Sequence, residues 1–214
     1  MDILLDEIEV RILGSLMEKS LTTPEYYPLS LHALTNACNQ KSNRDPVVAY
    51  DEKTVVRGLD SLREKQLVVL SASSRVPKYA EILVDTRKLV TREAALLIVL
   101  MLRGPQTVGE LRTRTERVYR FEDLADVEAT LEEMCDMGFV TRLPRTAGRK
   151  EPRFAHLLDG NPATESEDPK PEPATVMVRA ENERITALEG ELQRLRDELH
   201  DLRAEFAAFR KEFE

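Results

Sequence analysis

The sequence lacks tryptophan, has only 5% aromatic residues and contains two cysteines, Cys38 and Cys135. These cysteines lie far apart, without CxxC spacing and without a neighbouring pair of histidines, so neither a zinc site nor a disulfide framework is predicted. We expect both thiols to be buried as small hydrophobic groups.

The signatures of catalysis and of cofactor binding are also missing. The three histidines, His32, His156 and His200, are scattered, and the sequence has no nucleophile elbow and no glycine-rich phosphate loop. The many carboxylates fall on expected helix faces, where solvation is their ordinary role. We therefore predict a protein that is not an enzyme and that needs no cofactor and no metal.

No stretch approaches the roughly 18 apolar residues of a membrane span. The opening residues, MDILLDEIEV, carry acids where a secretory signal would carry bases, so the predicted location is the cytoplasm, away from membranes. The net charge is −8, but residues 1–158 carry 23 basic and 24 acidic side chains, and residues 159–214 carry 8 and 15. Because the acidity sits in the last part, nucleic-acid binding would need local basic clusters elsewhere.

The chain does contain two copies of one pattern. In the first copy, helical periodicity is expected over residues 6–20, 30–40 and 51–65, and two short β-prone runs follow at 67–72 and 78–84. Three helices followed by a β-hairpin is the order of a winged helix-turn-helix domain.

The second copy repeats this order. Helices are expected at residues 91–104, 108–118 and 123–138, and the two β-prone runs are 139–143 and 153–158. The predicted fold class is therefore mainly α with small β-hairpins (α+β), built as two tandem winged helix-turn-helix domains at residues 1–88 and 89–159.

One segment is present in the first copy only. Aligning the copies on Leu16 with Leu100, and on Leu59 with Leu131, leaves 12 extra residues between the first and third helices of the first domain. The polar run ACNQKSNRDPV, residues 37–47, lies in this excess; such loops are often functional, although some brace their own domain. We expect Lys41, Asn43 and Arg44 at a contact surface. The complete candidate contact loop is Asn39, Gln40, Lys41, Asn43 and Arg44.

The last quarter of the chain differs in composition. Residues 160–177 are rich in proline and acids and have almost no large apolar side chain, so we expect a disordered linker. From residue 178 to 214 the apolar residues alternate at spacings of three and four, which predicts a coiled coil. The predicted oligomerisation residues are Ile185, Leu188, Leu192, Leu195, Leu199, Leu202, Phe206 and Phe209.

Charges flanking this apolar seam indicate how two such helices would pair. With Ile185 at position a, each g residue faces an oppositely charged e residue of a parallel partner, beginning with Arg184 and Glu189. An antiparallel partner would bring like charges together in many pairs. We predict a parallel homo-oligomer, most simply a dimer; a helix that folds back on its own domains is the alternative, and a trimer is not distinguished from a dimer.

Winged helices suggest double-stranded DNA as a partner, since the third helix can enter the major groove while the wing contacts phosphate. In the first domain that helix has mixed charge. In the second, the helix at 123–138 has six acids and no base, so a groove walled by phosphates would repel it. The arginines nearby could equally pair with these acids. The candidate nucleic-acid contacts are Lys53, Arg57, Arg75, Arg112, Arg114, Arg145, Arg149 and Lys150.

Four stretches, TTPEYYPLS, ACNQKSNRDPV, LRGPQTVGELR and GRKEPRFAHL, resemble the signature motifs of the YceH-like family of bacterial proteins, in order from about residue 6 to residue 158. The resemblance implies tandem winged-helix domains with a coiled-coil tail. That family is biochemically uncharacterised, so the resemblance supplies no substrate. Two hypotheses of function stay open: a dimeric DNA-binding or transcription-regulatory protein, and a non-enzymatic scaffold that binds another protein through its winged helices.

Overall fold

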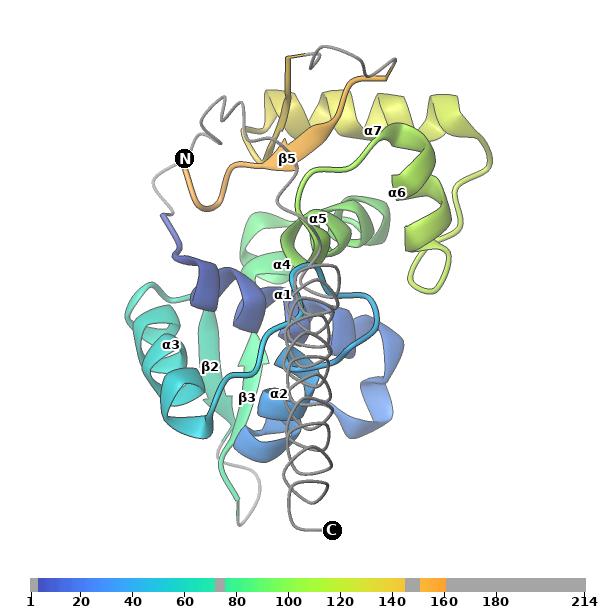
Figure 1. The fold of residues 1–214 in the computed structure, drawn as a ribbon. Helices are drawn as coiled ribbons and strands as arrows, with labels where there is room; N and C mark the ends of the chain where they lie inside the picture. Colours follow the sequence, from blue (N-terminus) through green and yellow to red (C-terminus); the bar gives the residue numbers. More distant parts are fainter. Residues whose placement is uncertain (1–3, 72–75, 145–150, 161–214) are drawn as a thin grey trace, which may run out of the picture. The chain divides into compact units, whose positions relative to one another are not determined.

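The computed structural model describes residues 4–71, 76–144 and 151–160, all of which belong to one compact unit. Within these residues the fold is mixed and mostly helical, with seven α-helices and two small antiparallel sheets (Figure 1). The expected class, mainly α with small β-hairpins, is confirmed at this level. The linker predicted after Gly160 and the coiled coil predicted at 178–214 lie outside the described residues.

Helices of the first half start where the sequence supplies a capping side chain. Asp6, Ser30 and Asp51 each accept a hydrogen bond from the backbone N–H three residues on, which fixes the first turn. The elements of this half are α1 (Glu7–Thr22), the 3₁₀ turn η1 (Pro24–Tyr26), β1 (Leu29–Ser30), α2 (Leu31–Cys38), α3 (Glu52–Glu64), β2 (Val68–Ser71), β3 (Lys78–Glu81) and α4 (Leu83–Arg87).

The sheet of the first half has the strand order β1-β3-β2, and both pairings are antiparallel. Leu70 lies opposite Tyr79, and on the other edge of β3 the same Tyr79 lies opposite Leu29. The hairpin formed by β2 and β3 was predicted; the two-residue strand β1 was not, because so short a run carries no periodicity.

The β-prone run predicted at residues 78–84 is wrong in its last part. Strand β3 ends at Glu81, and the chain turns into α4. The Glu81 carboxylate accepts a hydrogen bond from the backbone N–H of Val84 at 3.1 Å, and Leu83 is fully buried. A helical turn thus satisfies the local backbone and places Leu83 in the core.

The second half repeats the order of three helices and a hairpin. Thr107 and Asp123 cap its second and third helices, and Gly104, at φ +68°, ends the first in a conformation that glycine adopts without strain. The elements are α5 (Thr91–Arg103), α6 (Val108–Thr115), α7 (Leu124–Asp136), β4 (Val140–Arg142) and β5 (Phe154–His156), with β4 and β5 antiparallel.

Helix α1 is buried on more than the one face expected. Ile12, Leu13, Leu16 and Met17 have no exposed surface, as predicted. Its polar positions are also buried, because α1 packs against α2, α3 and α5 at once. Those buried polar residues are Glu9, Arg11, Ser15 and Glu18.

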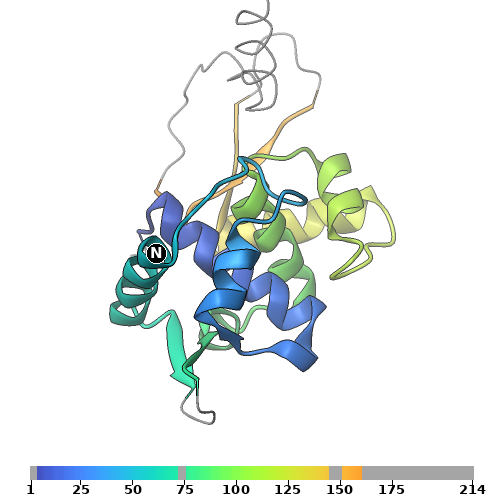
Figure 2. The same ribbon diagram turned by 60° about the horizontal axis from the view of Figure 1, so that its bottom comes forward.

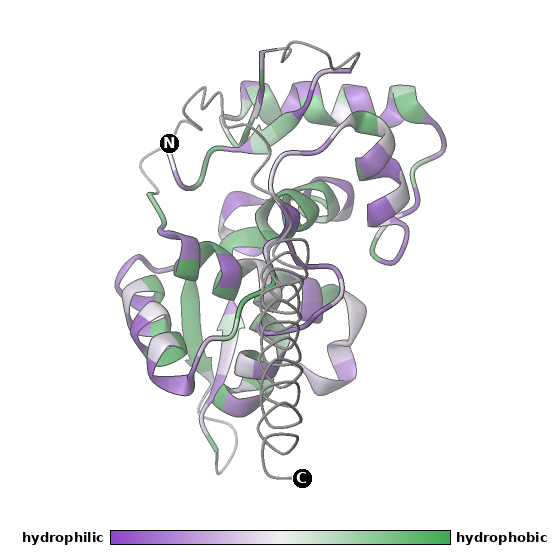
Figure 3. Ribbon diagram, viewed as in Figure 1, coloured by the Kyte–Doolittle hydropathy of each residue, from purple (hydrophilic) through white to green (hydrophobic). Residues whose placement is uncertain are grey.

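Helix α5 is apolar along most of its length and joins the two halves (Figure 3). Its contact with α1 is close at Gly14, where an added Cβ would lie 3.0 Å from the Leu102 side chain. The buried hydrophobic residues of both halves form one cluster. The domain boundary between residues 88 and 89 stays a prediction.

Candidate functional site

The exposed face of α3 holds the first candidate contacts. Asp51 caps the helix by accepting a hydrogen bond from the Thr54 N–H at 2.8 Å. Hydrogen bonds from the Thr54 side chain and backbone lower the pKa of the Asp51 carboxyl. The opposite face of α3 is an apolar stripe that includes Val55 and Leu59, and it is buried. Lys53 and Arg57, four residues apart, therefore share the exposed side of the N-terminal half of α3.

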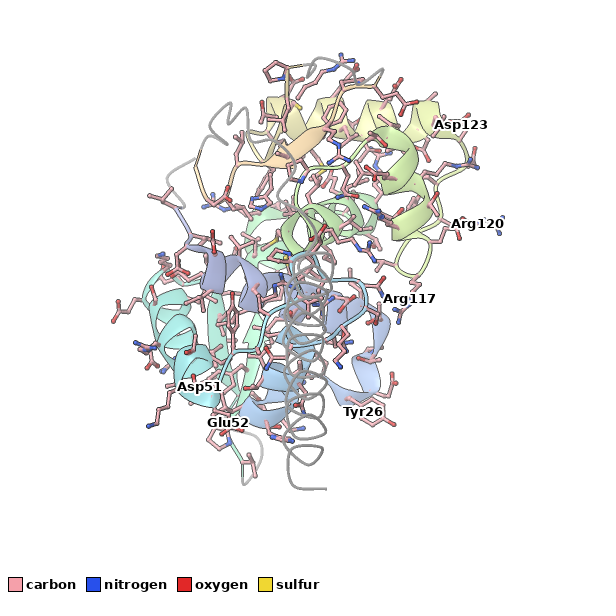
Figure 4. The ribbon with its side chains drawn as sticks, viewed as in Figure 1. Tyr26, Asp51, Glu52, Arg117, Arg120 and Asp123 are labelled. Atoms are coloured by element: carbon pink, nitrogen blue, oxygen red, sulfur yellow. The ribbon has the colours of Figure 1, made fainter. Side chains whose placement is uncertain are left out.

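An open groove of about 630 Å³ lies beside these two cations. Asp51 and Glu52 lie at the start of α3 (Figure 4), so the rim has mixed charge. One of these two acids already has a contact: the ring Nδ1 of His32, on α2, lies 3.4 Å from the Glu52 carboxylate. The groove is lined by Leu31, Asp51, Glu52, Lys53, Val56 and Arg57.

Both ends of the inserted loop are tied to its own domain. The Asn39 side chain donates to the Tyr50 carbonyl at 2.8 Å and accepts from the Tyr50 N–H at 2.8 Å. At the middle of the loop, the Asp45 N–H donates to the Leu102 carbonyl of α5 at 2.9 Å, so the loop lies beside that helix (Figure 2). Arg11 of α1 donates to the Pro46 carbonyl at 2.6 Å.

Arg44 was expected at the contact surface, and this prediction is wrong. Its side chain has no exposed surface and its guanidinium lies 2.7 Å from the Glu18 carboxylate. The same guanidinium donates to the carbonyls of Ala37 and Asn43, so its donors are used inside the protein. Arg44 holds the loop onto α1 and α2 because a buried guanidinium is stable only when it is paired and hydrogen-bonded.

The other residues of the candidate contact loop are more accessible. Lys41 is exposed and Gln40 is half-buried. Asn43 is half-buried and left-handed, at φ +59°, and its side-chain oxygen accepts a hydrogen bond from Arg103 of α5 at 2.7 Å. Only Lys41 of this set is exposed, so it is the loop residue most available to a partner.

Helix α6 brings Arg112 and Arg114 to the surface, but both have partners. Arg112 donates to the Glu122 carbonyl at 3.0 Å, and Arg114 lies 3.5 Å from Glu110. The acids of α7 remain largely exposed, and one of them, Glu133, pairs with Arg92 of α5 at 2.7 Å. The arginines of α6 are therefore not neutralised by α7.

Several predicted site residues lie outside the described residues: Arg75, Arg145, Arg149 and Lys150 of the two wings, and the oligomerisation residues from Ile185 to Phe209. Conversely, sequence reasoning did not identify Glu18 and Arg103 as members of a polar cluster. No local signal marks them, since their partners Arg44 and Asn43 lie 26 and 60 residues away along the chain.

Cys38 is fully buried, as expected, and burial raises the pKa of its thiol to about 11. Cys135 is only half-buried, so the expectation that both thiols are buried is too strong for this residue.

Across residues 4–71, 76–144 and 151–160, no three His, Cys, Asp or Glu side chains are placed to hold a metal ion. Within these same ranges, no helix has the length and apolar character needed to cross a membrane.

The described residues thus form a mostly helical protein with two small antiparallel sheets, one in each half. The chain belongs to the DUF480 family, whose model, described as "Protein of unknown function, DUF480", matches residues 5–149. This confirms the resemblance to a family of uncharacterised bacterial proteins.

Relatives cover most or all of the chain. A UPF0502 protein of Geotalea daltonii is 59% identical over 195 residues, which is 89% of each chain. One from Geotalea uraniireducens is 57% identical over 219 residues, and one from Solibacter usitatus is 51% identical over 217 residues, each spanning 100% of both chains. The similarity therefore extends through the tail as well as the described residues.

Proposed function

We propose that the protein is a DNA-binding, transcription-regulatory protein built from two tandem winged helix-turn-helix domains and a coiled-coil tail. The observation that carries this proposal is the pair Lys53 and Arg57, exposed together on the N-terminal half of α3, the third helix of the first half. In winged helices this helix enters the major groove.

The order of elements supports the same fold assignment. Each half has three main helices followed by an antiparallel hairpin, β2–β3 in the first and β4–β5 in the second. Fold alone does not establish function, so the proposal depends on the exposed cations. Lys53 and Arg57 would contact phosphates or base edges, while Lys41 of the inserted loop would add a peripheral charge.

The two halves would have different roles. Helix α7 exposes Glu128, Glu132 and Asp136, and such a helix is repelled from a phosphate-walled groove. Arg112 and Arg114 of α6 could approach only the backbone of the duplex. The first half would therefore contact bases in the major groove through α3, and the second half would contact only the duplex backbone.

The active form would be a cytoplasmic dimer joined through a parallel coiled coil at residues 178–214, without a cofactor and without enzymatic activity. Light scattering on the full chain tests this part. The expected result is a dimer for the wild type and a monomer for the L192D/L199D variant, since carboxylates at two seam positions disrupt the apolar contact. A wild-type monomer would contradict the dimer.

A titration of generic duplex DNA tests the proposed activity. Binding at about 50 mM salt should weaken steeply at about 200 mM, because neutralised phosphates release counterions. The absence of binding at the lower salt would overturn the proposal.

A second function, a protein-binding scaffold, is favoured by one observation, the exposed acidic face of α7. A basic protein partner would complement that face. Capture of partners by the full chain from nuclease-treated lysate, repeated with E128K/E132K, distinguishes the two functions: a protein retained by the wild type and lost by the variant supports the scaffold.

A further inference from the structure

A small pocket lies where the inserted loop meets α1, α5, α6 and the segment following α6. It has a volume of about 30 Å³, enough for a water-sized group. Its floor is apolar and includes Ile98 and Leu102 of α5. Three arginines line it, Arg103, Arg114 and Arg117. None of the lining residues belongs to α3, so this pocket is separate from the proposed DNA-reading face.

The charge of the pocket is strongly positive. Its one lining carboxylate, Glu18, is already neutralised by the buried Arg44 at 2.7 Å. The hydrogen bond and charge of Arg44 hold the pKa of Glu18 below its usual value, although burial acts in the opposite direction. Glu18 therefore stays ionised, and its single negative charge is shared among Arg44 at 2.7 Å, Lys19 at 3.6 Å and the more distant Arg117.

The arginines themselves are under-compensated. Arg103 is bonded to the neutral side chain of Asn43 at 2.7 Å. Burial together with the charge of Arg114 lowers the pKa of Arg103, although the charges of Asp45 and Glu110 act in the opposite direction. Arg114 has Glu110 at 3.5 Å, a carboxylate it shares with Arg153. Arg117 extends from the segment after α6 (Figure 4), and within the described part of the chain its charge acts on the carboxylate of Glu18, which Arg44 already pairs.

Like charges gathered over an apolar floor repel one another unless an anion lies between them. Guanidinium groups match phosphate especially well, since each offers paired N–H donors to its oxygens. We propose that Arg103, Arg114 and Arg117 bind a single phosphate group at the mouth of this pocket, where Arg114 and Arg117 are exposed, because the interior has room only for a water-sized group such as one phosphate oxygen.

This site would also link the two halves. Asn43 and Glu18 come from the first half, whereas Arg103, Arg114 and Arg117 come from the second. A bound phosphate would therefore strengthen a junction that already depends on the Arg44–Glu18 and Arg103–Asn43 contacts. The phosphate could be free or could belong to the DNA backbone, and both present the same chemistry.

Thermal unfolding of the full chain tests the site, with inorganic phosphate compared against chloride at equal ionic strength. A ligand that binds only the folded state raises the unfolding midpoint with concentration. The wild type should show such a rise, and R114Q/R117Q should bind phosphate about tenfold more weakly, as expected when charge-assisted hydrogen bonds are lost. Both replaced side chains are exposed, so the variant should fold.

The control is R112Q, on the same helix but outside the pocket, which should respond to phosphate as the wild type does. Equal responses to phosphate and chloride, or an unchanged response in R114Q/R117Q, would overturn the proposal. A duplex titration then identifies the source: weaker DNA binding by R114Q/R117Q indicates a backbone phosphate, and unchanged binding indicates a free phosphate. Failure of the α3 proposal leaves the phosphate test unaffected.

Discussion

The guanidinium of Arg44 and the carboxylate of Glu18 form a buried ion pair, 2.7 Å long, between the inserted loop and α1. Arg44 also donates to two backbone carbonyls, so the pair is part of a hydrogen-bonded network. The loop that looked most available to a partner is thus attached to the core through its arginine.

Breaking this pair should be costly. R44M leaves the buried Glu18 carboxylate with only the longer contact to Lys19, at 3.6 Å, and we expect a loss of about 3 kcal/mol in the free energy of unfolding, measured by urea denaturation. E133Q, which breaks the exposed Arg92–Glu133 pair, serves as the control and should change stability by less than about 1 kcal/mol. Equal effects of the two variants would show that burial of the Arg44 pair is unimportant.

The pair should also contribute to acid unfolding. Arg44 keeps the pKa of Glu18 lower in the folded state than the value of about 4.3 in the unfolded chain. A group with a depressed folded pKa stabilises the protein above the unfolded value, and this contribution is lost as the pH falls through the folded pKa. The stability difference between wild type and E18Q should therefore shrink below about pH 4; a difference independent of pH would contradict the assignment.

The Asn39 side chain should be needed to close the loop. N39A removes both hydrogen bonds to Tyr50 and leaves backbone groups unpaired, which predicts a loss of about 1–3 kcal/mol and faster hydrogen exchange at the Tyr50 amide. N39D keeps the acceptor and should lie between N39A and wild type. Asn36, exposed on α2, provides the control: N36A should leave the exchange rate of Tyr50 unchanged.

Two glycines give a matched test of helix packing. A Cβ at Gly58 of α3 would lie 2.5 Å from Ile12 in α1, so G58A should destabilise the protein by about 1–3 kcal/mol. A Cβ at Gly109 of α6 would meet nothing within 4 Å, and G109A should be neutral or stabilising by about 0.5–1 kcal/mol. Thermal unfolding compares them directly, and a G58A variant as stable as G109A would argue against close α1–α3 contact.

Local signals in the sequence predicted most of the elements. Capping residues such as Asp6 and Asp51 marked helix starts, and the apolar stripe of α3 identified its buried face. These features depend on residues within one or two turns of each other. The strand β1 and the helix α4 were missed because they are short and depend on pairing and burial supplied by distant segments.

The candidate site was predictable only where exposure follows from periodicity. Lys53 and Arg57 are exposed because they lie opposite the buried stripe of α3. The burial of Arg44 could not be predicted in this way, because a loop has no periodicity. Its partner, Glu18, lies on a helix that was expected to have only one buried face. Packing of α5 against α1 buries the other face and encloses that carboxylate.

The most direct test of the central claim, that the exposed face of α3 binds DNA, is fluorescence anisotropy of a labelled generic duplex with K53Q/R57Q. The control R63Q replaces an arginine of the same helix that is paired with Asp60 at 3.4 Å. We predict that K53Q/R57Q binds at least about tenfold more weakly at about 50 mM salt and that the slope of log affinity against log salt falls by about 1.8, whereas R63Q stays close to wild type. Wild-type affinity in K53Q/R57Q would contradict the account.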